Sequence, residues 1–223
     1  MTTPAPAALV VPVKAFHAAK GRLAAMLDPA ERALLSRRTA TAVLGAAGEA
    51  VPYVVCDDEE VAEWAKAEGA SVLWRPGLGL NAAVANAVAT AIALGHDGAI
   101  VAHADLPLAH DLDTLRQADE IVLVPDRVLD GTNVIALPRA LAAGFAFDYG
   151  PRSFERHLVA AHAISAAVRV VRDERLALDV DTPDDLTQPA LASLLDAVRR
   201  EGRSGREGGS EWTPRTTPAS HRP

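Results

Sequence analysis

The chain has 223 residues, of which 49% are hydrophobic and 23% are charged. This balance fits one folded α/β domain and excludes wholesale disorder. Its 22 lysines and arginines are outnumbered by 29 aspartates and glutamates, and the formal net charge of −7 argues against a nucleic-acid-binding surface.

Three features of the sequence predict a soluble, cytoplasmic protein. The single cysteine, Cys56, cannot form an internal disulfide, which fits a reducing compartment. Residues 1–8 lack the cationic start and apolar core of a signal peptide. The alanine-rich stretch at residues 82–94 is too short for a membrane span and contains Asn86, so we expect no membrane partner.

An apolar, β-branched run at residues 9–13 predicts a buried first strand. The first clear helix start comes only at Asp28, where Asp28-Pro29-Ala30-Glu31 offers an N-cap, a first-turn proline and a capping-box glutamate. We expect this helix to run towards Ala47. Residues 14–27 therefore form a long connection, since about two to six residues are typical. A long loop after a buried strand is a candidate functional segment.

Strand and helix patterns alternate along the rest of the chain. Strands are expected at residues 53–56, 71–74, 99–103, 120–124, 133–137, 168–171 and 178–180. Helices are expected after caps at Asp57 or Asp58, at Asn81, from Ser153 to about residue 164, and from Thr182 to about residue 199. This alternation implies right-handed crossovers, so the sequence predicts a doubly wound α/β fold with a mainly parallel sheet covered on both faces.

The composition changes near the end of the chain. From Gly202 onward it consists mainly of Gly, Ser, Arg, Thr and Pro with no periodic pattern. We expect a single domain over residues 1–201 and a disordered tail over residues 202–223 that takes no part in the chemistry.

Three cations follow the first predicted strand, at Lys14, Lys20 and Arg22. In open parallel sheets, ligands bind beyond the carboxyl ends of the strands. Cations at such a position suit a polyphosphate, because lysine supplies mobile charge and arginine can hold two oxygens at once. The segment lacks the Gly-Lys-Ser/Thr ending of a Walker loop. A solvated surface loop is the alternative interpretation.

Carboxylates follow two further predicted strands. Asp105 ends an uncharged strand, where an unpaired charge is costly to desolvate and a hard cation such as Mg²⁺ would relieve that cost. Capping of a helix after Pro107 is the alternative. Asp179 and Asp181 alternate along the short strand expected at residues 178–180, so both share one face and could point towards Asp105. Asp181 could also cap the final helix.

Glycine-containing turns carry further candidate residues. Thr132 follows Asp130-Gly131, and Ser153 follows Gly150 at the start of a helix, so both turns could donate hydrogen bonds to an anion. Ordinary turn and cap chemistry is the alternative for each. The turn at residues 77–81 would let the backbone approach a planar base, with Asn81 supplying amide contacts, and a simple loop with an N-cap would have the same pattern.

Taken in order, these segments resemble the 2-phospho-L-lactate guanylyltransferase family, which includes members that act on phosphoenolpyruvate in the biosynthesis of the deazaflavin coenzyme F420. The resemblance covers residues 9–186 and rests on Val11-Pro12-Val13-Lys14, Lys20-Gly21-Arg22-Leu23, Gly79-Leu80-Asn81, Ala104-Asp105-Leu106-Pro107, Asp130-Gly131-Thr132-Asn133, Gly150 with Ser153-Phe154 and His157, and Asp179-Val180-Asp181-Thr182-Pro183. It implies a Rossmann-like three-layer α/β/α nucleotidyltransferase fold with a mainly parallel mixed sheet.

The resemblance also implies a role for each candidate residue. The residues implied for the nucleotide are Lys14, Lys20 and Arg22 at the triphosphate and Asn81 beside the guanine. Those implied for the metal are Asp105, Asp181 and Asp179, with Asp105, Asp181 and Lys20 as the catalytic set. Those implied for the phospho-acid acceptor are Thr132, Gly150 and Ser153. Gly21 departs from the family, because many relatives carry a small hydroxyl residue there.

On this resemblance the chain joins GMP from GTP to phosphoenolpyruvate or 2-phospho-L-lactate, with Mg²⁺, and releases pyrophosphate. The expected partners are these two small anions. Two other functions stay open from the sequence. One is another nucleotidyltransferase of the same fold, specific for molybdopterin or a sugar phosphate, and the other is a nucleotide-binding module without catalysis.

Overall fold

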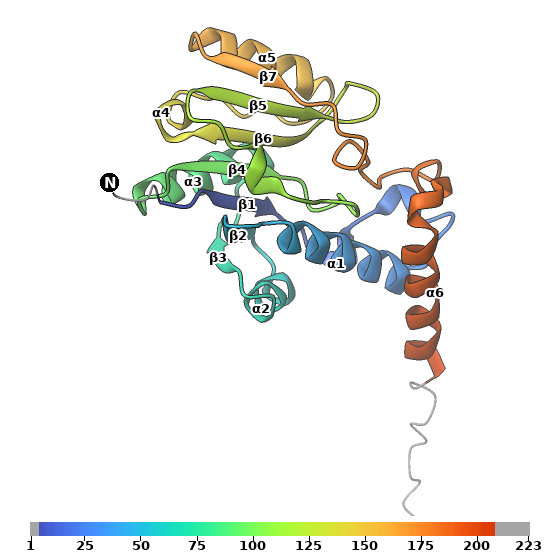
Figure 1. The fold of residues 1–223 in the computed structure, drawn as a ribbon. Coiled ribbons are helices and arrows are strands. Elements are labelled where there is room, and N and C mark those ends of the chain that lie inside the picture. Colours follow the sequence, from blue (N-terminus) through green and yellow to red (C-terminus); the bar gives the residue numbers. More distant parts are fainter. Residues whose placement is uncertain (1–4, 208–223) are drawn as a thin grey trace, which may run out of the picture.

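A computed structural model describes residues 5–207, which form one seven-stranded sheet with helices on both faces (Figure 1). The strands are β1 Ala8–Pro12, β2 Val51–Cys56, β3 Ser71–Trp74, β4 Gly98–Ala102, β5 Glu120–Pro125, β6 Thr132–Pro138 and β7 Ala167–Val170. The α-helices are α1 Pro29–Gly45, α2 Glu59–Ala67, α3 Leu80–Ala93, α4 Arg139–Ala142, α5 Ser153–Ala163 and α6 Ala192–Glu207. Short 3-10 helices are η1 Phe16–Ala18, η2 Gly21–Leu23, η3 Leu112–Leu115, η4 Asp185–Thr187 and η5 Pro189–Leu191.

The sheet has the strand order β3-β2-β1-β4-β6-β5-β7. Strand β6 is antiparallel to its neighbours β4 and β5, and the other pairings are parallel. The prediction of a mainly parallel sheet is therefore confirmed. Because the chain builds β2 and β3 on one side of β1 and then places β4 on the other side, the strand order reverses between β1 and β4. Ligands in open α/β sheets bind at such a reversal.

The alternation of side chains along β1 separates two hydrophobic cores. Leu9 and Val11 pack against α1 and α2 on one face, whereas Ala8 and Val10 pack against α3 on the other. All four side chains are fully buried, and burial of each leucine or valine contributes about 1.5 to 3 kcal/mol. An uncharged strand flanked by helices on both faces thus builds the expected three-layer arrangement.

The long connection after β1 is anchored to the body of the protein. It contains η1 and η2, and its apolar residues Phe16, Leu23 and Leu27 are buried. Helix α1 then starts with the predicted capping box, in which the Glu31 amide donates to Asp28 Oδ1 at 2.9 Å and the Asp28 amide donates to Glu31 Oε2 at 3.0 Å. The segment that carries the three candidate cations is therefore fixed at both ends.

Two predicted elements near the end of the chain are wrong. Residues 178–180 form no strand, because Leu178 and Val180 pack into a third cluster with α1 and α6, and the Val180 amide donates to the Asp105 carbonyl. The final helix does not start at Thr182. Pro189 lacks an amide hydrogen and holds Gln188 in an extended conformation, so η4 and η5 come first and α6 begins at Ala192.

Helix α6 stands beside α1 at one side of the molecule (Figure 1). It runs to Glu207 and so crosses the predicted boundary between residues 201 and 202. Residues 208–223 of the expected tail lie outside the described residues, and the domain division stays a prediction. Between residues 5 and 207, no helix has both the length and the apolar composition that a bilayer crossing requires.

Candidate functional site

A cavity of about 610 Å³ lies at the carboxyl ends of β1, β2 and β4, beside the reversal in strand order. Its floor comes from the strand ends, and its walls come from the loop after β1, the start of α3 and the middle of α1. The predicted residues Lys14, Lys20, Asp105 and Asp181 all line it. Four side chains from three distant stretches of the chain therefore meet in one pocket.

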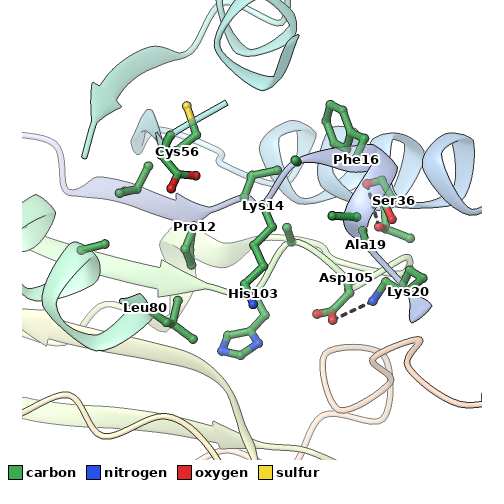
Figure 2. Close-up of a pocket in the computed structure, with 18 of the residues that line it drawn as sticks. Pro12, Lys14, Phe16, Ala19, Lys20, Ser36, Cys56, Leu80, His103 and Asp105 are labelled. Atoms are coloured by element: carbon green, nitrogen blue, oxygen red, sulfur yellow. Dashed lines mark hydrogen bonds and ion pairs between the residues drawn. The ribbon is translucent and has the colours of Figure 1, made fainter. Parts of the chain in front are cut away.

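Lys20 joins two of the predicted carboxylates. Its Nζ lies 2.8 Å from Asp105 Oδ2 and 3.0 Å from Asp181 Oδ1, and Figure 2 shows it reaching towards Asp105 from the loop after β1. The Lys20 side chain is only 7% exposed. Both carboxylates can therefore reach a single cation, which is the arrangement that the sequence predicts for a metal.

The pKa values of this group follow from burial and charge. Burial alone would lower the pKa of Lys20, but attraction by Asp105 and Asp181 outweighs it and raises that pKa above its ordinary value. Burial opposes ionisation of Asp105 too, and attraction by Lys20 still lowers the pKa of Asp105. Burial, together with repulsion by Asp105 and Asp181, raises the pKa of Asp179 to about 6. Two carboxylates thus pair with one ammonium group, and Asp179 adds a third carboxyl group that interacts with both of them through charge, so the acidic groups outnumber the basic one.

The backbone at Lys20 is in a left-handed conformation, with φ of +57°. Such a conformation costs a non-glycine residue about 1 kcal/mol or more, so surrounding contacts must hold it. The two ion pairs of Lys20 and the buried Leu23 in the next turn supply those contacts. The loop is therefore shaped to bring this ammonium group to the carboxylates.

Asp185 shapes the turn that carries Asp181. Its Oδ2 accepts hydrogen bonds from the amides of Asp181 and Thr182 at 3.0 and 2.7 Å and from the Thr182 hydroxyl at 2.9 Å. Its other oxygen pairs with Arg127 from the loop between β5 and β6. The sequence left open that Asp181 or Thr182 caps the last helix, but neither does, because that helix begins at Ala192. Asp185 instead fixes the backbone of the turn, and the Asp181 side chain faces Lys20.

Asn81 has a different place from the expected one. Helix α3 is capped by Gly79, and Asn81 lies within the first turn of the helix. Its Oδ1 accepts a hydrogen bond from the Tyr149 amide at 2.7 Å, and its Nδ2 donates to the Tyr149 carbonyl at 3.5 Å. The prediction of an N-cap at Asn81 is wrong, because this side chain holds the loop before α5. Its contact with guanine stays a prediction.

The predicted acceptor residues form a second cluster, centred on His157. Asp148 donates its amide hydrogen to His157 Nε2 at 3.0 Å, so the proton of the neutral ring is on Nδ1 and is donated to Thr132 Oγ1 at 2.9 Å. Ser153 Oγ accepts from the Thr132 amide at 3.1 Å. Thr132 and Ser153 are buried, and among the predicted acceptor residues only Gly150 is exposed. The structure thus joins these residues to one another.

His103 and Tyr149 connect the two clusters. His103 lines the cavity next to Asp105, and its ring lies 4.9 Å from the Tyr149 ring, which in turn lies 4.8 Å from the His157 ring. His103 Nε2, Asp105 Oδ1 and the Tyr149 hydroxyl are buried and have no hydrogen-bond partner among residues 5–207. Buried polar atoms normally have partners, and two of these three atoms, those of His103 and Asp105, belong to residues that line the cavity.

The remaining candidates lie outside the cavity. Arg22 is exposed on η2 and does not line the cavity. Asp179 does not line it either, and interacts with Asp105 and Asp181 electrostatically. The sequence patterns gave no site role to Asp57, which follows β2 directly and lines the cavity. The adjacent pair Asp57-Asp58 could have indicated this residue, because only one of the two aspartates is needed to cap the helix that follows. Asp58 caps α2 by accepting from the Val61 amide at 3.0 Å, which leaves Asp57 without a structural task.

Comparison with known proteins identifies the family. Residues 7–192 match the model of the guanylyl transferase CofC-like family. The chain belongs to this guanylyl transferase family. Among its relatives, the phosphoenolpyruvate guanylyltransferase of Rubrobacter xylanophilus is 40% identical over 191 residues, which cover 80% of this chain and 91% of the relative. The 2-phospho-L-lactate guanylyltransferase of Methanothermobacter thermautotrophicus is 32% identical, with 82% and 83% covered.

Solved structures support the fold of this guanylyl transferase. A putative nucleotide-diphospho-sugar transferase from Desulfovibrio desulfuricans superposes with a TM-score of 0.67 at 17% identity, covering 90% of this chain and 96% of the other. A Mycobacterium tuberculosis protein solved in complex with manganese superposes with a TM-score of 0.50 at 20% identity, covering 82% and 96%. At these identities the likeness establishes the shared nucleotidyltransferase-type fold, as the resemblance implied.

The residues of this guanylyl transferase fit a hard divalent cation. Asp105 and Asp181 supply carboxylate oxygens, and the unpartnered Asp105 Oδ1 has unused acceptor capacity. Over residues 5–207, no three or more His, Cys, Asp or Glu side chains are arranged to hold a metal ion by themselves. Mg²⁺ is usually held by one or two carboxylates together with substrate phosphates, which is the donor set available here.

Proposed function

We propose that this guanylyl transferase joins GMP from GTP to phosphoenolpyruvate and releases pyrophosphate. The observation that carries the proposal is that Asp105 and Asp181 both pair with the ammonium group of Lys20, in a cavity that Lys14 also lines. A site for two polyanionic reactants needs positive charge at the reacting phosphates and carboxylates to hold a metal ion. This arrangement supplies both.

The reaction needs no covalent intermediate with the protein. A phosphate oxygen of the acceptor attacks the α-phosphorus of GTP, a new P–O–P linkage forms, and the bond to the β-phosphate breaks to release pyrophosphate. A phosphate dianion is nucleophilic at neutral pH, so no general base is required. The principal tasks of the protein are to bring the two anions together in line and to stabilise the departing pyrophosphate.

We assign those tasks to particular side chains. Lys14 is exposed and makes no hydrogen bond or ion pair with any described residue, so its ammonium group is available to a phosphate. Figure 2 shows it extending from the end of β1 towards His103. Lys20 would contribute to phosphate binding once a metal takes its place between the carboxylates. Arg22 at the rim of the loop is a further phosphate contact in this proposal.

We propose Mg²⁺ as the metal, held by Asp105 and Asp181 with Asp179 close by. When bound, it would neutralise phosphate charge and act as a Lewis acid at the reacting phosphate. The excess negative charge of the three carboxylates and the unpartnered Asp105 oxygen support this assignment. The manganese complex of the Mycobacterium tuberculosis protein shows that a protein of similar fold binds a divalent cation.

For the acceptor, we propose that Thr132, Gly150 and Ser153 bind the phospho-acid. The exposed Gly150 has φ of +125°, which a side chain would strain, and the turn it forms is closed by the hydrogen bond from the Ser153 amide to its carbonyl. We favour phosphoenolpyruvate over 2-phospho-L-lactate, since the 40% identical relative carries the former name and the 32% identical relative the latter. The cytoplasmic location stays a prediction from the sequence.

The proposal is tested by incubating the purified protein with GTP, Mg²⁺ and phosphoenolpyruvate while pyrophosphate release is followed. We expect release and a product whose mass equals that of the acceptor plus GMP. Parallel reactions with 2-phospho-L-lactate and 3-phosphoglycerate test the acceptor, and CTP, UTP and ATP test the nucleotide. Pyrophosphate release with none of the three acceptors would overturn the assignment, and release with a different nucleotide would indicate another nucleotidyltransferase of this fold.

A further inference from the structure

The cavity has two ends with different chemistry. Lys20, Asp105 and Asp181 form one end, beside β4. The other end, beyond β2 and at the start of α3, is lined by apolar side chains, including Leu78 and Leu80, which are 43% and 37% exposed. A nucleotide bound with its phosphates at the first end would direct its base towards the second. Apolar side chains suit the face of a purine ring.

The spacing of the strands supports this direction. Strand β1 lies between β4 and β2, and neighbouring strands are about 4.8 Å apart, so the ends of β4 and β2 are separated by about 10 Å. That separation matches the reach of a nucleotide from its α-phosphate to the far edge of its base. The ribose would lie over the end of β1, between the two ends of the cavity.

Most polar side chains of the cavity already have partners. The Ser36 and Thr39 hydroxyls donate to carbonyls of α1. The Arg75 guanidinium bonds to Asn86, to Thr90 and to the Trp74 carbonyl. Asn81, the residue expected to read the base, does not line the cavity and bonds to the backbone of Tyr149. These side chains are therefore committed to the fold.

Asp57 is different. It directly follows β2, its side chain is exposed, and it forms no hydrogen bond or ion pair within the part of the chain that the structure describes. Its negative charge would repel phosphate groups, so it can only favour the base or the ribose of a bound nucleotide. Its position at the end of β2 places it at the base.

We propose that Asp57 is the residue that selects guanine, by accepting hydrogen bonds from N1–H and the 2-amino group of the base. Guanine is the one common base that presents two adjacent donors on its pairing edge, and a carboxylate with two acceptor oxygens is their matched partner. Adenine would place an acceptor nitrogen against this carboxylate and be repelled. This inference rests on the proposed use of GTP and assigns the specificity of the same site.

The test compares GTP with inosine triphosphate, which lacks only the 2-amino group. Binding of each nucleotide with Mg²⁺ is measured by calorimetry for the wild type and for Asp57→Ala. We expect the wild type to bind GTP about 10-fold or more tightly than inosine triphosphate, and Asp57→Ala to bind the two equally. Because Asp57 has no structural partner, the variant is expected to keep the melting temperature of the wild type.

A second variant gives a gain of binding. In Asp57→Asn the side-chain amide can donate to the 2-carbonyl of xanthine, so we expect weaker binding of GTP and tighter binding of xanthosine triphosphate than in the wild type. Glu59→Gln in the first turn of α2 removes another exposed carboxylate nearby and serves as the matched control, with wild-type selectivity expected.

The outcomes separate this inference from the proposed function. If the wild type binds GTP and Asp57→Ala still discriminates against inosine triphosphate, Asp57 does not read the base and the inference is overturned. Binding of 2′-deoxy-GTP, which lacks only the 2′-hydroxyl of the ribose, is measured in parallel. If Asp57→Ala loses only the preference for GTP over 2′-deoxy-GTP, Asp57 binds the ribose and the inference is also overturned. Failure of the wild type to bind GTP, with binding of another nucleotide, would overturn the proposed function and this inference with it.

Discussion

The buried ring of His157 should make the stability of the protein fall in mild acid. Burial lowers the pKa of His157 to about 4 from an ordinary 6.5. The negative charge of Asp148 opposes this effect, whereas the neighbouring His103 and Arg156 act in the same direction as burial. Protonation would remove the acceptor at Nε2 that the Asp148 amide uses. The folded protein therefore favours the neutral ring.

The magnitude and sign follow from proton linkage. Between pH 6.5 and pH 4 the unfolded chain binds a proton at His157 that the folded chain does not, so the stabilising effect of the neutral ring is complete above pH 6.5 and is lost as the pH falls. The two pKa values correspond to a loss of about 2.5 kcal/mol in the free energy of unfolding at pH 4.5. Carboxylates also contribute to acid unfolding, so a reference variant is needed.

His157→Gln is the reference, because glutamine does not titrate and can still accept from the Asp148 amide and donate to Thr132. Urea unfolding of both proteins at pH 8 and pH 4.5 gives two free-energy changes, and we expect the wild type to lose about 2.5 kcal/mol more than the variant. A titration of the ring by NMR measures the pKa directly. Equal losses in the two proteins, or a measured pKa near 6.5, would refute the reasoning.

Three further changes probe the site and the sheet. Asp105→Asn should abolish pyrophosphate release. The control Asp184→Asn changes an exposed carboxylate on the turn after Asp181 and should keep the rate of release within about twofold of the wild type. An active Asp105→Asn enzyme would contradict the metal assignment. Asn81→Ala removes both hydrogen bonds to the Tyr149 backbone, so steady-state kinetics should show a raised KM for the phospho-acid and an unchanged KM for GTP. A raised KM for GTP alone would instead make Asn81 a contact of the base. Gly98 lies at the start of β4, and Gly98→Ala would place the new Cβ 2.5 Å from the Leu137 carbonyl oxygen of β6. Urea titrations should show a free energy of unfolding about 1 to 3 kcal/mol lower than in the wild type. Unchanged stability would show that β4 and β6 can move apart without cost.

Local patterns in the sequence predicted most of the elements. The apolar run of β1, the capping box of Asp28 and Glu31, and the strand at residues 71–74 all occur where they were expected. Each of these features depends on neighbours a few residues away, so the sequence contains the information directly. The expected strand at residues 178–180 failed for the opposite reason. The segment does alternate, but its apolar side chains pack against α1 and α6, and no strand between residues 5 and 207 pairs with it.

In the candidate site, too, residue types could be identified from the sequence, whereas the contacts between them could not. Asp105 and Asp181 were identifiable as carboxylates that follow buried or extended segments, and their meeting point depends on Lys20, which lies 161 residues before Asp181. The role of Asn81 depends on Tyr149, 68 residues further along the chain. No local pattern predicts which of two adjacent aspartates, Asp57 or Asp58, caps α2.

The sequence by itself determined which chemical groups this guanylyl transferase has and in what order the strands and helices carry them, because those properties depend on residue type and short-range spacing. Only the tertiary structure decided which groups are available to a ligand. A side chain such as Asn81 or Ser36 is lost to the site when a backbone group lies within hydrogen-bond distance, and one such as Asp57 or Lys14 stays available when none does. That competition is settled by packing between distant segments.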